Sequence, residues 1–226
     1  MPKKKTFRLP NKIIPIESFD KKYWREKWYE GRNMLNLPHS FRLICIGPPD
    51  SGKSTLIKNI IIRAKPEFER ILLYHFGTGA EYDDVDAEHI DELDPLDYED
   101  NEEKTLLIIE DCNFKNCDKT TKYNLNRLFG YTSSHCNLSI ALTSQNPYDI
   151  SPEIRRMANT ISLWRNHDMN SLNTLASRCG INKQKMENIM LNLLQNPHDF
   201  LMIDLQMNSP AKYRINGFNK LTFLTK

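Results

Sequence analysis

The feature that most constrains the fold of this chain is a glycine-containing loop between an apolar segment and a helix-forming one. Residues 41–46 (FRLICI) have the length and apolar character of a buried strand, and residues 56–64 (LIKNIIIRA) are typical of a helix. The loop between them follows the pattern G-x-x-x-x-G-K-S and consists of Gly47, Pro48, Pro49, Asp50, Ser51, Gly52, Lys53, Ser54 and Thr55. A strand before and a helix after form the context that a phosphate-binding loop requires.

This loop predicts a binding site for ATP with Mg²⁺. Backbone N–H groups must point inward around a triphosphate, so glycine is needed where the chain turns tightly. The N-terminus of the following helix adds a partial positive charge. We expect Lys53 to reach the β- and γ-phosphates and the Ser54 hydroxyl to bind Mg²⁺.

A second apolar strand ends in two carboxylates. Residues 105–109 (TLLII) are followed directly by Glu110 and Asp111. A buried parallel strand delivers such groups at its carboxyl end beside the phosphates, where one can hold Mg²⁺ and the other can orient the attacking water. By register, Glu110 takes the metal position and Asp111 the catalytic one. The order Glu-Asp reverses the more usual Asp-Glu, so this division of roles stays open.

The remaining segments alternate between strand and helix patterns. Apolar runs predict strands at residues 70–76, 137–143 and 160–164 and a terminal pair at 200–205 and 212–215, with helices at 118–131, 147–157, 172–178 and 183–194. This alternation predicts an α/β fold with a mostly parallel central sheet flanked by helices. The strand inserted between the two motif strands indicates a P-loop NTPase of the additional-strand, catalytic-glutamate type, which contains motors rather than nucleotide kinases.

A polar amide follows the predicted strand at residues 137–143. Gln145 stands just past the end of this strand, next to the carboxylates. In that position it can sense the γ-phosphate or position the attacking water, or it can be an ordinary loop amide.

The net charge of +2 conceals an uneven distribution. Residues 81–103 contain thirteen of the 29 acidic side chains and no Lys or Arg, so the rest of the chain carries 31 basic side chains against 16 acidic ones. A body this basic indicates a polyanionic partner. We expect the acidic stretch to be a solvated surface loop; shielding of the basic surface until nucleic acid displaces it is a second interpretation.

We expect two parts in the chain: a basic, aromatic arm and helix over residues 1–40, and an ATPase domain over 41–226. The second part includes the acidic loop at 81–103 and the terminal strand pair at 197–226. The aromatic residues of segment 19–36 either pack on the core or offer a stacking platform for nucleic acid. No apolar run approaches the ~18 residues of a membrane span and no secretory signal is apparent, so we expect a chain that is not secreted. The five cysteines lack the spacing of a zinc or disulfide framework and are expected to be reduced.

Beyond the loop, a series of short segments resembles the genome-packaging ATPases of the FtsK–HerA superfamily in poxviruses, other large DNA viruses, virophages and Polinton-type elements. The resemblance extends from about residue 20 to residue 216. It is carried by the common order of residues 134–140 (SHCNLSI), 144–146 (SQN), 154–156 (IRR), 161–166 (ISLWRN), 175–176 (LA) and 197–205 (PHDFLMIDL). Glu110-Asp111 departs from the two Asp or Asp-Glu usual in that family, and Met157 stands where Asn often follows the basic pair.

The resemblance implies a homo-oligomeric ring, a pentamer or hexamer, that sits at a capsid vertex or portal component. Such a ring pulls double-stranded DNA by its phosphate backbone into a preformed capsid, in the host cell cytoplasm or viral factory and at the packaging vertex of the virion. Lys and Arg residues within 115–127 are candidates for a basic channel without base readout.

A hydrolysis motor of this kind completes its catalytic site with an arginine from the neighbouring subunit. Arg155 is the first candidate, and Arg156 and Arg127 follow it. Each of the three can instead contact DNA phosphate or form a surface ion pair.

Two other functions compete with a packaging motor. A phosphotransferase resembling a nucleotide kinase would need an arginine-rich lid, and no such cluster stands out in the sequence. A nucleotide-gated assembly protein would bind ATP and hydrolyse it negligibly; substitution of Lys53 and Asp111 would separate it from a motor.

Overall fold

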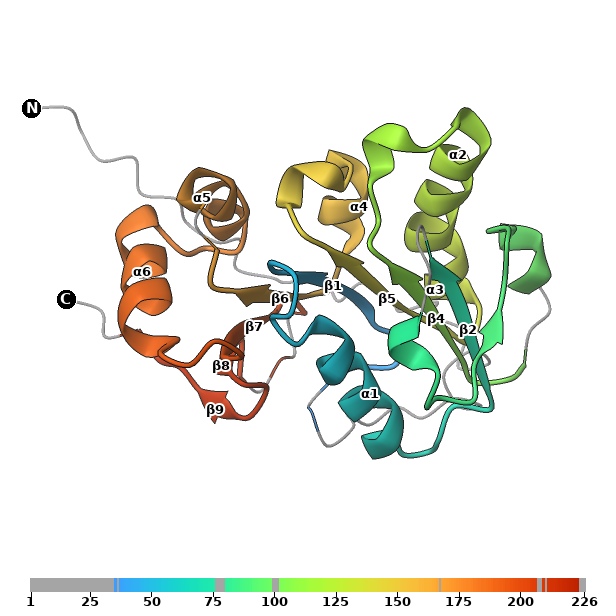
Figure 1. The fold of residues 1–226 in the computed structure, drawn as a ribbon, viewed down its shortest axis with the longest axis horizontal. Helices are drawn as coiled ribbons and strands as arrows, with labels where there is room; N and C mark the ends of the chain where they lie inside the picture. Colours follow the sequence, from blue (N-terminus) through green and yellow to red (C-terminus); the bar gives the residue numbers. More distant parts are fainter. Residues whose placement is uncertain are drawn as a thin grey trace, which may run out of the picture.

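The structure is a computed structural model that describes Leu35, residues 37–75, 80–98, 102–166, 168–206 and 211–223, and Ser209. The expected arm and helix of residues 1–34 lie outside this part of the chain. Within the described residues, one nine-stranded sheet has the order β3-β2-β4-β5-β1-β6-β7-β8-β9 (Figure 1). The strands are β1 Arg42–Ile46, β2 Arg70–His75, β3 Glu88–His89, β4 Thr105–Glu110, β5 Leu138–Ser144, β6 Thr160–Trp164, β7 Phe200–Asp204, β8 Tyr213–Ile215 and β9 Asn219–Lys220.

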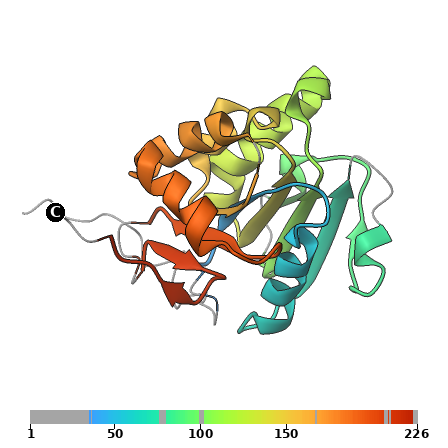
Figure 2. The same ribbon diagram turned by 60° about the vertical axis from the view of Figure 1, so that its left-hand side comes forward.

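The strands from β3 to β6 are parallel, and β7, β8 and β9 extend the sheet in antiparallel fashion. Helix α1 (Lys53–Arg63) covers one face, and the other helices cover the opposite face (Figures 1 and 2). These are α2 Lys119–Arg127, α3 Ser133–His135, α4 Pro152–Met157, α5 Met169–Arg178 and α6 Lys183–Asn188. Helices α2 and α6 each continue into a π-helical turn, Leu128–Thr132 and Ile189–Leu193.

Strand β1 shows why the central strands carry apolar side chains on both faces of the sheet. Leu43 and Cys45 pack in the core beneath α1, whereas Ile44 and Ile46 belong to the larger core on the opposite face. Side chains of a strand alternate between the two faces, and a parallel sheet covered on both sides buries both sets. The continuous apolar runs at 41–46 and 105–109 follow from this arrangement.

The predicted fold class is confirmed, including the extra strand between the two motif strands. That strand is β5, which pairs with both β1 and β4. Helix α4 begins at Pro152, inside the predicted range 147–157: the Ser151 hydroxyl accepts a hydrogen bond from the Ile154 N–H at 3.1 Å, and Pro152 takes the first helical position. No helix among the described residues is long and apolar enough to cross a membrane.

The expectation of a simple solvated loop for residues 81–103 was wrong. This stretch contains β3 and two 3₁₀ turns, Ala80–Tyr82 and Pro95–Tyr98, and it buries Tyr82, Leu93 and Tyr98. The three apolar side chains stand between acidic ones, so the composition of the stretch hides residues that pack on the sheet. The short strand β9 was not predicted either.

Candidate nucleotide-binding site

The glycine-containing loop connects the end of β1 to the start of α1. Gly52 has φ 100° and Asp50 has φ 56°, so the chain turns through left-handed conformations just before the helix. A Cβ on Gly47 would lie 2.6 Å from the Ser51 hydroxyl and 2.8 Å from Trp164 Cβ, which leaves no room for a side chain. The loop leads directly into α1, so the N-terminus of this helix and its first backbone N–H groups point at the space that the loop encloses.

Lys53 is held inside this loop. Its side chain is 7 % exposed, and its Nζ donates hydrogen bonds to the carbonyl oxygens of Gly47 at 3.1 Å and Pro48 at 2.9 Å. The ammonium group and the helix N-terminus thus concentrate positive charge at one point. Together they form a binding site suited to a phosphate group.

Glu110, the last residue of β4, faces the start of α1. The Ser54 hydroxyl donates to Glu110 Oε1 at 3.2 Å, and the Tyr82 hydroxyl donates to Oε2 at 2.9 Å. The carboxyl group is 4 % exposed, and its burial raises the pKa of Glu110. The neighbouring charge of Asp111 also raises this pKa, while the hydrogen bonds from Tyr82 and Ser54 lower it.

Asp111 lies at the point where the chain leaves β4. Its φ of 49° ends the strand, and its N–H donates to the Thr143 hydroxyl on β5 at 2.9 Å. The Asp111 side chain is exposed, in contrast to the buried Glu110. The two carboxylates therefore have different environments: one contacts the helix that follows the loop, and the other is accessible to water.

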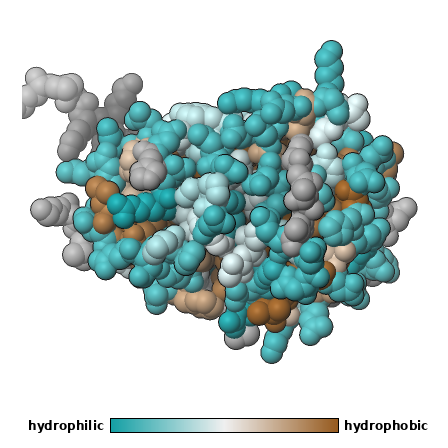
Figure 3. All heavy atoms as spheres, viewed as in Figure 1, coloured by the Kyte–Doolittle hydropathy of each residue, from teal (hydrophilic) through white to brown (hydrophobic). Residues whose placement is uncertain are grey.

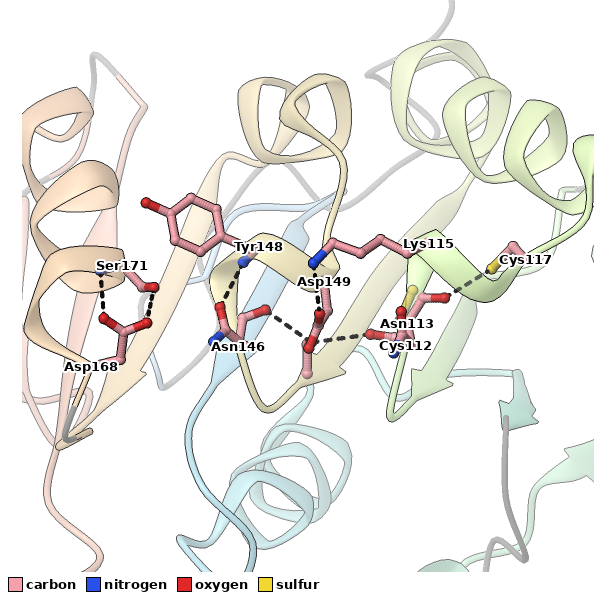
Figure 4. A network of polar contacts seen from close by, with 10 residues as sticks. Cys112, Asn113, Lys115, Cys117, Asn146, Tyr148, Asp149, Asp168 and Ser171 are labelled. Carbon is pink, nitrogen blue, oxygen red and sulfur yellow. Dashed lines mark hydrogen bonds and ion pairs between the residues drawn. The ribbon is translucent and has the colours of Figure 1, made fainter.

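Polar contacts hold the ends of β4 and β5 together (Figure 4). The Ser144 hydroxyl donates to the Cys112 carbonyl oxygen at 3.0 Å, and Lys115 Nζ lies 3.6 Å from Asp149. Asn146 Oδ1 accepts the Tyr148 N–H at 2.9 Å and shapes the turn that follows β5. The network fixes the chain on both sides of Gln145 relative to the end of β4.

A cavity of about 820 Å³ joins these groups. Its lining includes the loop and first helical turn from Pro49 to Thr55, together with Glu110, Asp111 and Gln145. Its volume lies within the roughly 300–1,000 Å³ of small-molecule sites. The structure thus brings the predicted loop, both carboxylates and the predicted amide to one place, across the intervening strand β5.

The three candidate arginines lie elsewhere. Arg155 is partly buried on α4, with its guanidinium 5.7 Å from the centre of the Tyr148 ring. Arg156 is exposed and paired with Glu153 at 3.0 Å, and Arg127 is the last residue of α2. Among the described residues that line the cavity, Arg63 is the only arginine. A role for Arg155, Arg156 or Arg127 in a neighbouring subunit's site stays a prediction.

Comparison with known proteins identifies the fold. No protein-family model matches the chain. The structure resembles the genome packaging NTPase B204 of Sulfolobus turreted icosahedral virus 2 in complex with sulfate, with a TM-score of 0.60 and 19 % identity over 83 % of this chain and 99 % of B204. B204 from Sulfolobus turreted icosahedral virus, a DNA-packaging ATPase, gives a TM-score of 0.54 at 19 % identity over 76 % of this chain and 95 % of that one. This chain has the fold of the genome packaging NTPase B204.

The structure also resembles a secretion ATPase. The cytoplasmic domain of the type VII secretion ATPase EccC from Thermomonospora curvata gives a TM-score of 0.51 at 12 % identity, over 77 % of this chain and 26 % of EccC. In sequence, type VII secretion system protein EssC of Staphylococcus aureus is 29 % identical over 90 residues, which is 38 % of this chain. The chain matches only 6 % of the length of EssC.

The donor set of this site fits Mg²⁺. The Ser54 hydroxyl and the Glu110 carboxylate are hard oxygen ligands within hydrogen-bonding distance of each other at the cavity wall. Bound there with the phosphates, Mg²⁺ would neutralise part of their negative charge. Asp111 is left exposed at the same wall, in a position to orient a water molecule.

Two parts of the site were not predicted from the sequence. Tyr82 donates to Glu110 from within the acidic stretch, and no sequence pattern marks it. The hairpin of β8 and β9 brings Asn216 and Phe218 to the cavity lining, next to His198. The dipeptide Asn216-Gly217 was the available signal, since Asn-Gly between extended segments is typical of a tight hairpin turn.

Proposed function

We propose that this chain hydrolyses ATP and uses the free energy to move double-stranded DNA into a preformed viral capsid, as one subunit of a homo-oligomeric ring. The observation that carries the proposal is the single cavity that unites Lys53 with Glu110 and Asp111 across β5. The same fold, matched over 99 % of B204, occurs in a genome packaging NTPase.

In the proposed reaction, the loop and Lys53 bind the triphosphate, and Ser54 and Glu110 hold Mg²⁺. Asp111 orients a water molecule for attack on the γ-phosphorus, and the bond from that phosphorus to the leaving oxygen of ADP breaks as the new bond forms. Gln145, at the end of β5, is placed to sense the γ-phosphate. The negative charge that develops is stabilised by Lys53, by the N-terminus of α1 and by an arginine from the neighbouring subunit, with Arg155 as first candidate.

The proposed DNA contacts are electrostatic. Lys115 and Lys119 are exposed around the start of α2, and Lys122 lies one turn further along the helix. The face of the molecule shown in Figure 3 is mostly hydrophilic, with apolar residues in scattered patches. Contacts to phosphates carry no sequence information, as traction on any genome requires. A capsid vertex or portal component would anchor the ring in the virion.

The test is the steady-state ATPase rate of the purified chain with and without double-stranded DNA of mixed sequence. DNA should raise kcat, with a stimulation that declines as salt concentration rises. Lys53→Ala should abolish hydrolysis in both conditions and serves as the control for a contaminating ATPase.

Other results would identify the competing functions. A rate that depends on an added nucleoside or nucleotide acceptor, and not on DNA, would indicate a phosphotransferase. Packaging that persists in both Lys53→Ala and Asp111→Asn would refute the motor and leave an assembly protein.

A further inference from the structure

The cavity continues well beyond the groups that handle phosphate. From the N-terminus of α1 it follows the helix past Asn59 to Arg63 and reaches Phe200 on β7 and Phe218 in the turn between β8 and β9. Figures 1 and 2 place β8 and β9 beside α1, so this end of the cavity has α1 as one wall and the hairpin as the other. A nucleoside triphosphate bound by the loop needs a place for its base, and this extension supplies the space.

The hairpin wall is rigid. Asn216 and Gly217 have φ angles of 53° and 78°, and the Phe218 N–H donates to the Ile215 carbonyl oxygen at 3.3 Å, as in the type I′ turn of a tight hairpin. The Asn216 backbone N–H donates to the Phe200 carbonyl oxygen at 3.0 Å, and the Asn216 side-chain oxygen accepts the Phe200 N–H at 3.0 Å. The turn is therefore anchored to β7, and Phe218 is held on a preformed support.

Phe218 is exposed on this support. Its side chain is 56 % exposed, and it lines the cavity together with Leu35 and Phe200. An accessible aromatic ring at the edge of a ligand cavity offers a face on which a base can stack. His198 connects this wall to the loop, because its Nδ1–H donates to the Ser51 carbonyl oxygen at 3.3 Å.

The side-chain amides at this end already have partners within the protein. Asn59 Nδ2 donates to the Thr55 carbonyl oxygen at 2.9 Å, and Asn59 Oδ1 accepts from Arg63 Nε at 3.3 Å. Asn216 Nδ2 donates to Asp199 at 2.7 Å, and Asn216 Oδ1 is occupied by the Phe200 N–H. Each amide keeps one N–H and one oxygen lone pair, so these bonds orient the amides without using up their capacity. Stacking on Phe218 is the contact at this end that any purine base can make.

We propose that the β8–β9 hairpin forms the nucleobase subsite, in which Phe218 stacks on the face of a purine base. This inference rests on the proposed nucleoside triphosphatase function and extends it to the residue that binds the base. Phe218 is a binding residue here: it contributes to affinity and not to the chemical step.

The test is equilibrium binding by calorimetry with Mg²⁺ and three ligands: non-hydrolysable analogues of ATP and of GTP, and inorganic tripolyphosphate. Phe218→Ala should weaken binding of both nucleotide analogues by about 5- to 150-fold, the contribution of stacking one base on an aromatic ring. Tripolyphosphate has no base, so its affinity should not change.

Two variants serve as controls. Phe218→Trp keeps a stacking face and should retain nucleotide affinity. Tyr123→Ala removes an aromatic ring that is 63 % exposed on α2, outside the cavity lining, and should bind all three ligands like the wild type.

The outcomes separate this proposal from the one on which it rests. If the wild type binds and hydrolyses ATP but Phe218→Ala changes neither nucleotide affinity, the stacking wall is refuted while the ATPase stands. If the wild type binds neither the nucleotides nor tripolyphosphate, the nucleotide site itself is refuted and both proposals fall.

Discussion

Tyr82→Phe tests the support of Glu110 without changing the shape of the core. Tyr82 is 1 % exposed, and its hydroxyl is one of two side-chain donors to the buried Glu110 carboxyl. Phenylalanine keeps the ring and removes only the donor. A hydrogen bond to a charged group contributes about 1.5–3 kcal/mol, and an unsatisfied buried carboxylate loses that amount. The free energy of unfolding should fall accordingly, and the melting temperature by roughly 3–12 °C for a chain of this size.

The same substitution should change the requirement for Mg²⁺. If Glu110 holds the metal ion as proposed, Tyr82 orients a metal ligand, and loss of such a partner typically costs about 10- to 100-fold in metal affinity or activity. The assay is the ATPase rate titrated with Mg²⁺ at saturating ATP, alongside thermal unfolding without nucleotide. The half-saturating Mg²⁺ concentration should rise by that factor in Tyr82→Phe.

Tyr98→Phe is the matched control. Tyr98 is equally buried and belongs to the same acidic stretch, but it is Tyr82 and not Tyr98 that donates the hydrogen bond to Glu110. A wild-type Mg²⁺ dependence in Tyr82→Phe would refute the proposed role of Tyr82 in orienting Glu110. An equal shift of the Mg²⁺ dependence in Tyr98→Phe would refute it as well. Tyr82 itself is further tied to the site by Lys58, whose Nζ lies 5.9 Å from the Tyr82 ring centre and pairs with Asp84.

Three further predictions concern other parts of the molecule. Arg155→Ala should lower the ATPase rate by about 10³–10⁵-fold if Arg155 acts in a neighbouring subunit. Mixing it with Lys53→Ala should then restore activity, because mixed rings form sites with both groups intact; failure to recover on mixing would exclude the trans role of Arg155. Arg156→Ala removes a solvent-exposed ion pair and should retain stability within about 1 kcal/mol and the wild-type rate. Burial lowers the pKa of His39 below its usual range, so the unfolded chain binds the proton first, and urea midpoints should fall as pH drops below about 6.5. His39→Gln should reduce that pH dependence, and an unchanged pH profile in this variant would contradict the assignment.

Local sequence patterns identified the residues that we propose to bind the phosphates and Mg²⁺. The loop around Lys53 is contiguous and has fixed spacing, and the strand before Glu110 has a burial pattern set by its place inside a covered parallel sheet. The sequence left open which carboxylate takes the metal. The 3.2 Å contact from Ser54 to Glu110 now favours Glu110, because the serine that follows Lys53 is the expected metal-binding hydroxyl.

Other features depend on packing that no local pattern encodes. Tyr82 meets Glu110 across 28 positions of sequence, and its neighbours are mostly acidic, so composition indicated a loop where the chain packs on the sheet. The proposed stacking of a base on Phe218 depends on how the β8–β9 hairpin folds back beside α1. The arginine that completes the site is the least accessible to sequence reasoning, because its position relative to the cavity is set by subunit arrangement and not by the fold of one chain.

The intervening strand also explains why this site suits hydrolysis by water. Neighbouring strands lie about 4.8 Å apart, so β5 separates the end of β1 from the end of β4 by roughly 9.6 Å. Adjacent motif strands would place the two ends only about 4.8 Å apart. With β5 in between, a γ-phosphate bound by Lys53 and a water oriented by Asp111 fit side by side. Gln145, at the end of that same strand, then faces the space between them. The order of the strands in the sheet thus sets the spacing that the proposed reaction requires.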